Sequence, residues 1–116
     1  MIKFICYPKC TTCRKAMKWL DDHNIAYEFR DIKTENPTLE ELNEWHKISG
    51  LPLKKFFNTS GLLYKSMDLK NKLASATENQ MLELLATDGM LVKRPLLITD
   101  EIVLVGFKED EYKKLL

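Results

Sequence analysis

Hydrophobic residues recur with two different periods near the start of the chain. Residues 2–6 form a mostly apolar run, which is typical of a buried strand. Residues 11–23 follow with a helical spacing, and their apolar face carries Cys13, Ala16, Met17 and Leu20. Ile25, Tyr27 and Phe29 then alternate with polar residues, which predicts a second strand. A strand, a helix and a strand joined by short links predict a βαβ unit with two parallel strands.

The middle of the chain carries helical signals and no convincing strand. Thr38–Glu41 and Thr77–Gln80 are both capping boxes, the pattern that opens a helix. The remaining signals are helix stops at Gly50 and Asp88-Gly89, a short helix that Pro52 opens and Asn58–Gly61 breaks, and a weak helical pattern over residues 62–74. Together they predict a helical insert over about residues 38–90.

Strand signals return in the last part of the sequence. Residues 96–98 and 102–105 are apolar runs, and the short polar link between them suits an antiparallel hairpin. A last helix starts near Lys108, with acidic residues first and basic residues last, the order that the helix dipole favours. The whole pattern predicts an α/β fold with a βαβ half, a ββα half, a four-stranded mixed sheet and the helical insert between the halves.

Composition indicates one domain over residues 1–116 with ordinary hydrophobic and charged fractions. Lys and Arg total 18 and Asp and Glu total 17, so the net charge of +1 gives no support to direct nucleic-acid binding or to a membrane-surface function. No apolar stretch has the length of a membrane span, and we expect no signal peptide because Met1-Ile2-Lys3 leads straight into the first strand. Three cysteines, an odd number, argue against a secreted disulfide framework. We expect a cytoplasmic monomer whose cysteines are mostly reduced.

Cys10 and Cys13 lie where the first strand gives way to the first helix. A thiol in the first turn of a helix is stabilised as a thiolate by free backbone N–H groups and by the helix dipole. The cations Lys9 and Arg14 act in the same direction. Cys13 falls one turn later on the inward face, where it can attack a mixed disulfide formed on Cys10. The pair therefore predicts thiol–disulfide exchange.

Two other interpretations of the thiol pair stay open, namely half of a zinc site and two structural thiols. A tetrahedral zinc site needs four ligands, and the further candidates are Cys6, His23 and His46. Cys6 belongs to an apolar strand, and His23 lies at the far end of the same helix as the pair. We therefore expect no metal and no organic cofactor.

Three segments carry a family resemblance: Tyr7-Pro8-Lys9-Cys10, Lys93-Arg94-Pro95-Leu96-Leu97-Ile98 and Val105-Gly106-Phe107-Lys108-Glu109-Asp110-Glu111. With the helical insert, they make the chain resemble the glutaredoxin-coupled arsenate reductase family, which has a thioredoxin-like fold and also contains Spx-type transcription regulators and thiol reductases. The resemblance covers essentially the whole chain. It implies that Cys10 is the nucleophile, that Arg94 holds an oxyanion near it, and that Pro95 is a cis-proline facing the active-site turn.

The chain departs at two points from the arsenate reductases of that family. Those reductases carry further arginines, whereas the matching stretches here, 56–59 and 105–107, contain none. Arg94 with Lys9 or Arg14 provides few cationic hydrogen-bond donors for a multiply charged oxyanion. The one-cysteine reductases also lack a residue like Cys13. Both differences favour the branch with the CxxC pair.

The sequence thus predicts a thiol–disulfide oxidoreductase in which Cys10 attacks, Arg94 steadies the negative charge and Cys13 resolves the product. Thioredoxin, glutaredoxin or a low-molecular-weight thiol is the expected reductant. One alternative is a redox-sensing Spx-type regulator that binds the C-terminal domain of the RNA polymerase α-subunit. Those regulators continue with a C-terminal tail, whereas this sequence ends at Leu116, which favours the oxidoreductase. The second alternative is true arsenate reduction.

Overall fold

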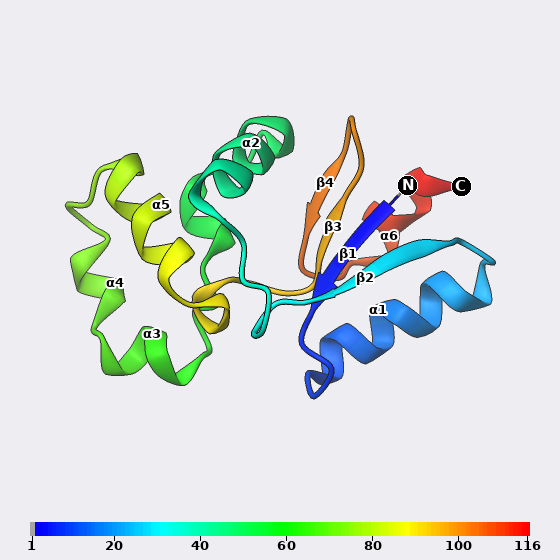
Figure 1. Cartoon of the computed structure of the whole chain (residues 1–116), viewed down its shortest axis with the longest axis horizontal. Helices are drawn as coiled ribbons and strands as arrows, with labels where there is room; N and C mark the ends of the chain where they lie inside the picture. The colour runs from blue at the N-terminus through cyan, green and yellow to red at the C-terminus, as the bar shows by residue number, and fades with distance from the viewer. Residues whose placement is uncertain (1) are drawn as a thin grey trace.

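A computed structural model of the protein describes residues 2–116 and arranges them as a sheet with helices on both faces (Figure 1). The strands are β1 (Ile2–Cys6), β2 (Tyr27–Asp31), β3 (Leu96–Ile98) and β4 (Val103–Val105). They lie in the order β2-β1-β3-β4, with β1 parallel to β2 and antiparallel to β3, and with β3 antiparallel to β4. The predicted four-stranded mixed sheet is therefore confirmed.

The helices follow the order that the sequence predicts. They are α1 (Thr11–Asp22), α2 (Leu39–Ser49), α3 (Leu62–Ser66), α4 (Leu69–Lys72), α5 (Glu78–Thr87) and α6 (Glu109–Tyr112), with 3-10 turns at Leu53–Phe56, Gly89–Leu91 and Lys113–Leu115. Both predicted capping boxes form, because Thr38 accepts from the Glu41 N–H and Thr77 accepts from the Gln80 N–H. Within the described residues, no helix is long and apolar enough to cross a membrane.

Two predicted elements differ in detail from the structure. The second strand begins at Tyr27 rather than at Ile25, because its register pairs Tyr27 with Ile2 at the start of β1. Phe29 on this edge strand is 44% exposed, so the alternation in β2 does not mark a fully buried face. The weak helical pattern over 62–74 forms two short helices, α3 and α4, separated at Asp68, whose φ of 53° is incompatible with a continuous helix.

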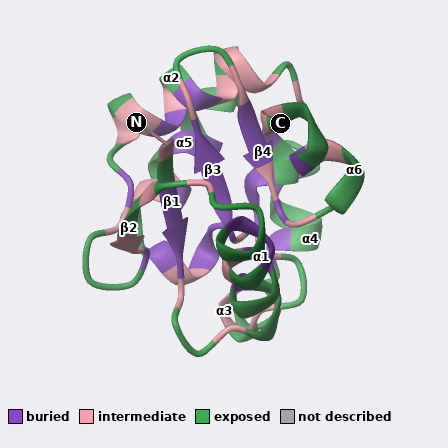
Figure 2. Ribbon diagram, turned by 90° about the vertical axis from the view of Figure 1, so that its right-hand side faces the viewer, coloured by how far each residue is buried: buried purple, intermediate pink, exposed green. Residues whose placement is uncertain are grey.

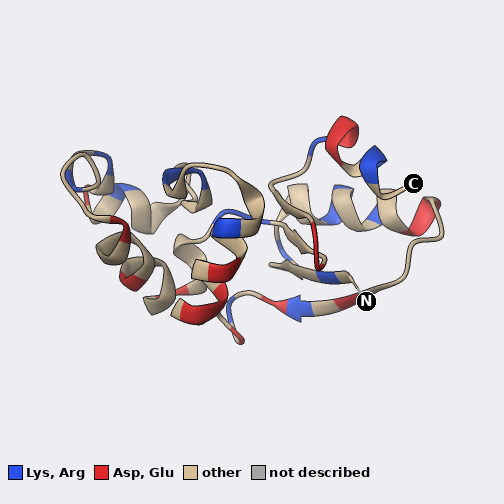
Figure 3. Ribbon diagram, turned by 90° about the horizontal axis from the view of Figure 1, so that it is seen from above, with Lys and Arg blue, Asp and Glu red and all other residues tan. Residues whose placement is uncertain are grey.

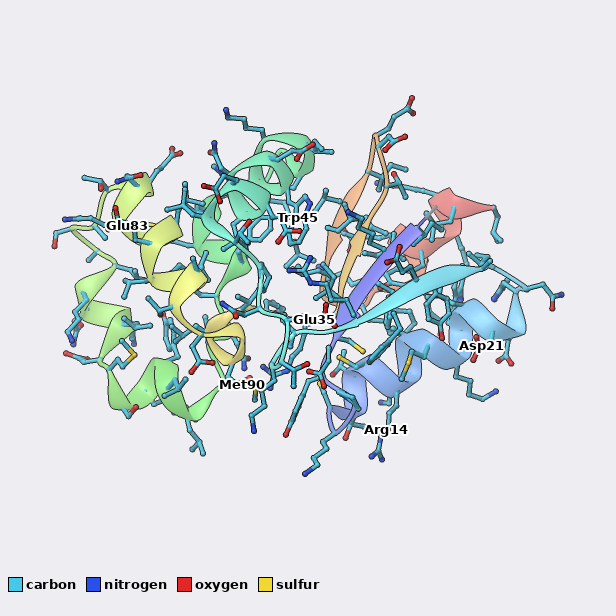
Figure 4. The ribbon with its side chains drawn as sticks, viewed as in Figure 1. Arg14, Asp21, Glu35, Trp45, Glu83 and Met90 are labelled. Atoms are coloured by element: carbon cyan, nitrogen blue, oxygen red, sulfur yellow. The ribbon has the colours of Figure 1, made fainter. Side chains whose placement is uncertain are left out.

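The sheet separates two apolar clusters (Figure 2). On one face, α1 and α6 pack through residues such as Ala16, Leu20 and Tyr112 against Phe4 and Leu97 of the strands. On the other face, the helices of the insert pack against the alternate strand residues, which include Ile5, Leu96, Ile98 and Val103. Trp45 of α2 lies between its helix and β4 (Figure 4). Side chains alternate along β1, so Phe4 and Cys6 belong to one cluster and Ile5 belongs to the other.

An ion pair and a close backbone approach attach the insert to the end of β2. The Arg30 guanidinium donates to both carboxylate oxygens of Glu41 at 2.7 and 2.9 Å, and also to the carbonyls of Glu35 and Asn36. This bidentate pair holds the pKa of Glu41 down at about 2, chiefly through the hydrogen bond from Arg30. Gly89, at the end of the insert, lies so close to Ile32 that a Cβ there would sit 1.7 Å from the Ile32 carbonyl oxygen.

Candidate active site

Cys10 is the residue that caps the N-terminus of α1. Its φ and ψ are extended, and its side chain accepts no capping hydrogen bond. Its backbone N–H donates to the Tyr7 carbonyl at 2.9 Å, which folds the link between β1 and α1 into a tight turn. The sulfur atom is half-buried at the helix N-terminus, where free backbone N–H groups favour a negative charge.

Cys13 lies one turn further along α1 and is completely buried. Its Sγ accepts a hydrogen bond from the Tyr7 backbone N–H at 3.3 Å. The interaction with the Cys6 thiol, together with burial, raises the pKa of Cys13 well above its usual range. All three cysteines are free thiols in this structure. The helix thus gives the two thiols of the pair unequal access to solvent, as its apolar periodicity predicts.

Arg94 lies directly before β3, and its guanidinium approaches the turn that carries Cys10. The Arg94–Pro95 peptide bond is cis, which the family resemblance implied, and Pro95 itself is buried. The Arg94 guanidinium carbon lies 5.4 Å from the centroid of the Tyr7 ring, a cation–π distance. Its Nε and Nη1 atoms are buried and find no hydrogen-bond partner among residues 2–116. Buried N–H donors of a charged group call for an acceptor, and an anion is the natural one.

Cys10 and Arg94 both line a cleft of about 490 Å³. Its remaining charged lining residues are Lys55, Lys93, Lys108 and Glu111. Four cations against one acid make a local excess that the chain as a whole does not have, because its net charge is only +1 and both signs are spread over it (Figure 3). The cleft therefore attracts anions to the sulfur of Cys10.

The helical insert contributes one wall of this cleft through backbone pairing. Phe57 and Val92 form an isolated antiparallel bridge. The Lys93 N–H donates to the Phe56 carbonyl at 2.7 Å, and the Asn58 N–H donates to the Leu91 carbonyl at 2.8 Å. These bonds bring the segment after the Leu53–Phe56 turn beside the residues that precede Arg94. Lys55 and Asn58 therefore face the same cleft as Cys10 although they are far from it in sequence.

The wall opposite the insert begins where β4 ends. Gly106 has a φ of +79° and donates its N–H to the Pro95 carbonyl at 2.9 Å. A Cβ at this position would lie 3.2 Å from Cε of Lys93, so glycine serves both the turn and the close approach of that lysine. Phe107 and Lys108 follow directly and also line the cleft.

The structure brings together some of the predicted site residues and separates others. Cys10 and Arg94 share the cleft, Cys13 lies buried behind Cys10, and Pro95 follows Arg94 in the core. Lys9 and Arg14 are exposed and lie outside the lining of the cleft. The Arg14 Nε donates to the Pro8 carbonyl at 3.1 Å, and the residue lies on the outer side of α1 (Figure 4).

Three lysines of the cleft were not among the predicted site residues. Lys93 and Lys108 belong to two of the three segments that carry the family resemblance, so their place next to Arg94 and Phe107 was a usable signal. Lys55 had no such signal, because only the long-range bridge between Phe57 and Val92 brings it to the site. Together with Arg94, these lysines supply the positive charge of the cleft. Across residues 2–116, no cluster of three or more His, Cys, Asp or Glu side chains could hold a metal ion.

Comparison with known proteins places these observations in a family. The model of the ArsC family matches residues 6–115, which include the thiol pair and the cleft cations. The chain belongs to the ArsC family. Its fold is that of the thioredoxin-like members of this family, as the resemblance in sequence implied.

The relatives that this ArsC chain resembles carry different functional descriptions. YusI of Bacillus subtilis, described as an uncharacterized protein, is 51% identical over 97% of this chain and 96% of its own length. The global transcriptional regulator Spx of Listeria innocua is 30% identical over 100% of this chain and 87% of its own. A crystal structure of a Bacteroides fragilis protein described as ArsC family related superposes with a TM-score of 0.98 at 55% identity, covering 99% of this chain and 97% of that one.

Proposed function

We propose that the protein is a thiol–disulfide oxidoreductase that uses Cys10 as its nucleophile and Cys13 as its resolving thiol. The observation that carries this proposal is the arrangement of the two thiols on α1. The half-buried Cys10 at the N-terminus of the helix lines a cleft with four cations, and Cys13 is fully buried one turn later. Membership of the ArsC family supports redox chemistry at this turn.

The reaction proceeds by two exchanges at sulfur. The Cys10 thiolate attacks one sulfur of an oxidised substrate, forms a mixed disulfide and releases the other sulfur as a thiolate. Cys13 then loses its proton and attacks the Cys10 sulfur, which releases the second part of the substrate and leaves a Cys10–Cys13 disulfide. An external thiol reductant, of the thioredoxin, glutaredoxin or low-molecular-weight class, restores both thiols.

The cations of the cleft assist the first exchange. Arg94 has buried N–H groups without a partner among residues 2–116, so it can donate to an anionic substrate or to the departing thiolate. Lys55, Lys93 and Lys108 raise the local concentration of such anions. The raised pKa of Cys13 delays the second exchange, because the thiol must first lose a proton that its buried site retains. The second exchange should therefore become faster as the pH rises.

A coupled reductase assay with a low-molecular-weight mixed disulfide tests the proposal. Wild type should turn over, and Cys10→Ser should lose at least about 10³-fold of the rate because the nucleophile is gone. Cys13→Ser should still form the mixed disulfide on Cys10, which intact-mass spectrometry detects. Turnover that survives in Cys10→Ser would refute the proposal. The same assay with arsenate as substrate tests the narrower reaction, and arsenate-dependent turnover that disappears in Cys10→Ser would support it.

The likeness to Spx over the whole chain favours a second candidate, a redox-sensing regulator. In this case the thiol pair would act as a sensor, and the protein would bind the C-terminal domain of the RNA polymerase α-subunit. A pull-down with that domain, carried out with reduced and with oxidised protein, separates the two candidates. An oxidoreductase should show no specific binding in either state.

A further inference from the structure

Cys6 is a third thiol at the site, and the proposed exchange gives it no role. It is the last residue of β1, on the strand face that α1 covers. Cys6 and Cys13 are both 0% exposed and belong to the same apolar cluster. A free cysteine in a core usually acts as a small hydrophobic residue, so the question is what its sulfur contacts.

Cys13 lies in one apolar cluster with both other cysteines, because Cys6 belongs to this cluster and the half-buried Cys10 packs against it. Tyr7, the residue that follows Cys6, donates its backbone N–H to Cys13 Sγ at 3.3 Å, which holds that sulfur against the end of β1. The neighbouring Cys6 thiol and burial both raise the pKa of Cys13. Cys10 lines the cleft, whereas Cys6 is closed off from it in the core. Cys13 thus shares the cluster between β1 and α1 with one cysteine at the cleft, Cys10, and with another inside the protein, Cys6.

We propose that the Cys10–Cys13 disulfide rearranges to a buried Cys6–Cys13 disulfide and thereby frees the thiol of Cys10. This inference rests on the proposed function, because it starts from the Cys10–Cys13 disulfide. The Cys6 thiol loses its proton, and its sulfur attacks the sulfur of Cys13. The Cys13–Cys10 bond breaks, and Cys10 leaves as a thiolate that can take up that proton. One disulfide and one thiol are present before and after, so the step needs no oxidant or reductant.

The surroundings of the three sulfurs favour this direction of exchange. Cys10 leaves at the N-terminus of a 12-residue helix and in the cleft that Arg94 also lines, where backbone N–H groups and positive charge favour a departing anion. The new disulfide lies among apolar side chains of the cluster between β1 and α1, which suit an uncharged bond. An oxidised molecule would then still present a nucleophile at the cleft, and its buried disulfide would be shielded from external reductants.

A tryptic digest distinguishes the two possible disulfides of this chain. Cleavage after Lys3, Lys9 and Arg14 places Cys6 on the peptide 4–9 and places Cys10 and Cys13 together on the peptide 10–14. A Cys10–Cys13 disulfide is internal to one peptide, whereas a Cys6–Cys13 disulfide joins two. The full-length protein is oxidised with diamide, freed from the oxidant and sampled over time. Each sample is quenched with acid and treated with N-ethylmaleimide in denaturant before digestion and mass spectrometry.

The expected result is a joined peptide pair that carries the maleimide on Cys10. With time this pair should become the more abundant oxidised species, while the peptide with the internal disulfide declines. In Cys6→Ala, the joined pair should be lost completely and the internal disulfide should remain, and Cys6→Ser should give the same pattern. If wild type keeps only the internal disulfide, or if the joined pair carries its label on Cys13, the inference is overturned and the proposed function stands. If neither disulfide forms, both fail.

Discussion

The half of the protein formed by the sheet, α1 and α6 differs from the helical insert in how it contributes to the cleft. The first half supplies the thiols and Arg94 from short local segments, the turn into α1 and the cis peptide before β3. The insert supplies Lys55 and Asn58, which reach the cleft only because residues 56–58 pair with residues 91–93. The chemistry of the site therefore depends on local geometry, whereas one of its four cations, Lys55, and one wall of the cleft depend on how the insert is attached.

The attachment of the insert can be broken at one glycine. Gly89→Ala places a methyl group 1.7 Å from the Ile32 carbonyl oxygen, so the backbone must move, and we expect a loss of about 3 kcal/mol or more in the free energy of unfolding. Gly50→Ala is the matched control, because a Cβ there meets nothing within 4 Å and only its φ of +69° is strained. That variant should lose about 1 kcal/mol. Urea denaturation measures both, and equal losses would contradict this view of the attachment.

Among the cations of the cleft, removal of Arg94 should have the largest effect on activity, without comparable loss of stability. Arg94→Leu should lower kcat/KM for an anionic disulfide substrate by about 10²-fold, as expected when a donor to developing negative charge is removed. Arg14→Leu is the control, because Arg14 is exposed and lies outside the cleft lining. Steady-state kinetics of the two variants decide the matter. Similar losses in both would show that positive charge near the turn matters and that the position of Arg94 does not.

The Arg30–Glu41 pair offers a second, pH-dependent test of the attachment. The pKa of Glu41 is about 2 in the folded protein and about 4.3 in an unfolded chain, so the pair stabilises the fold above pH about 4.3 and loses this contribution as the pH falls towards 2. Arg30→Met should cost about 2 kcal/mol at pH 7 and much less near pH 2. Lys18→Met, which removes an exposed pair with Asp22, should change little. A cost of Arg30→Met that is independent of pH would exclude the ion pair as its cause.

The lysines of the cleft should have the smallest effects. Lys55→Gln should raise KM for an anionic substrate about three-fold, the size of one partly screened charge interaction. Lys54→Gln, its exposed neighbour in the same turn, does not line the cleft and should leave KM unchanged. Kinetics at low and at high salt check the origin of the effect, because added salt should abolish the difference between the two variants. A difference that persists at high salt would point to a contact other than charge.

The contrast between the two halves also explains what the sequence could predict. The parallel pairing of β1 and β2, α1 and the unequal burial of Cys10 and Cys13 follow from periodicity and from the short links of a βαβ unit, which are local or nearly local rules. The capping boxes correctly placed the starts of α2 and α5. The break at Asp68 was not foreseen, because a left-handed backbone at a residue other than glycine leaves little trace in sequence.

The parts of the site that could not be predicted depend on long-range pairing. No pattern near Lys55 indicates that the bridge between Phe57 and Val92 will carry it to Cys10. Lys9 and Arg14 are close to the thiols in sequence, which predicts that they stabilise the thiolate, yet both are exposed and lie outside the lining of the cleft. Proximity along the chain is a poor guide to charge at a helix N-terminus, because successive residues there face different directions.

Alkylation of the reduced, folded protein tests the central claim most directly. Iodoacetamide is added under native conditions, samples are taken over time, and fragment spectra of the peptides 4–9 and 10–14 locate the label. Cys10 should react alone, and Cys13 and Cys6 should react only after unfolding, because both are completely buried. Labelling of Cys13 at a rate equal to that of Cys10 would contradict the assignment of Cys10 as the attacking thiol and Cys13 as its buried partner.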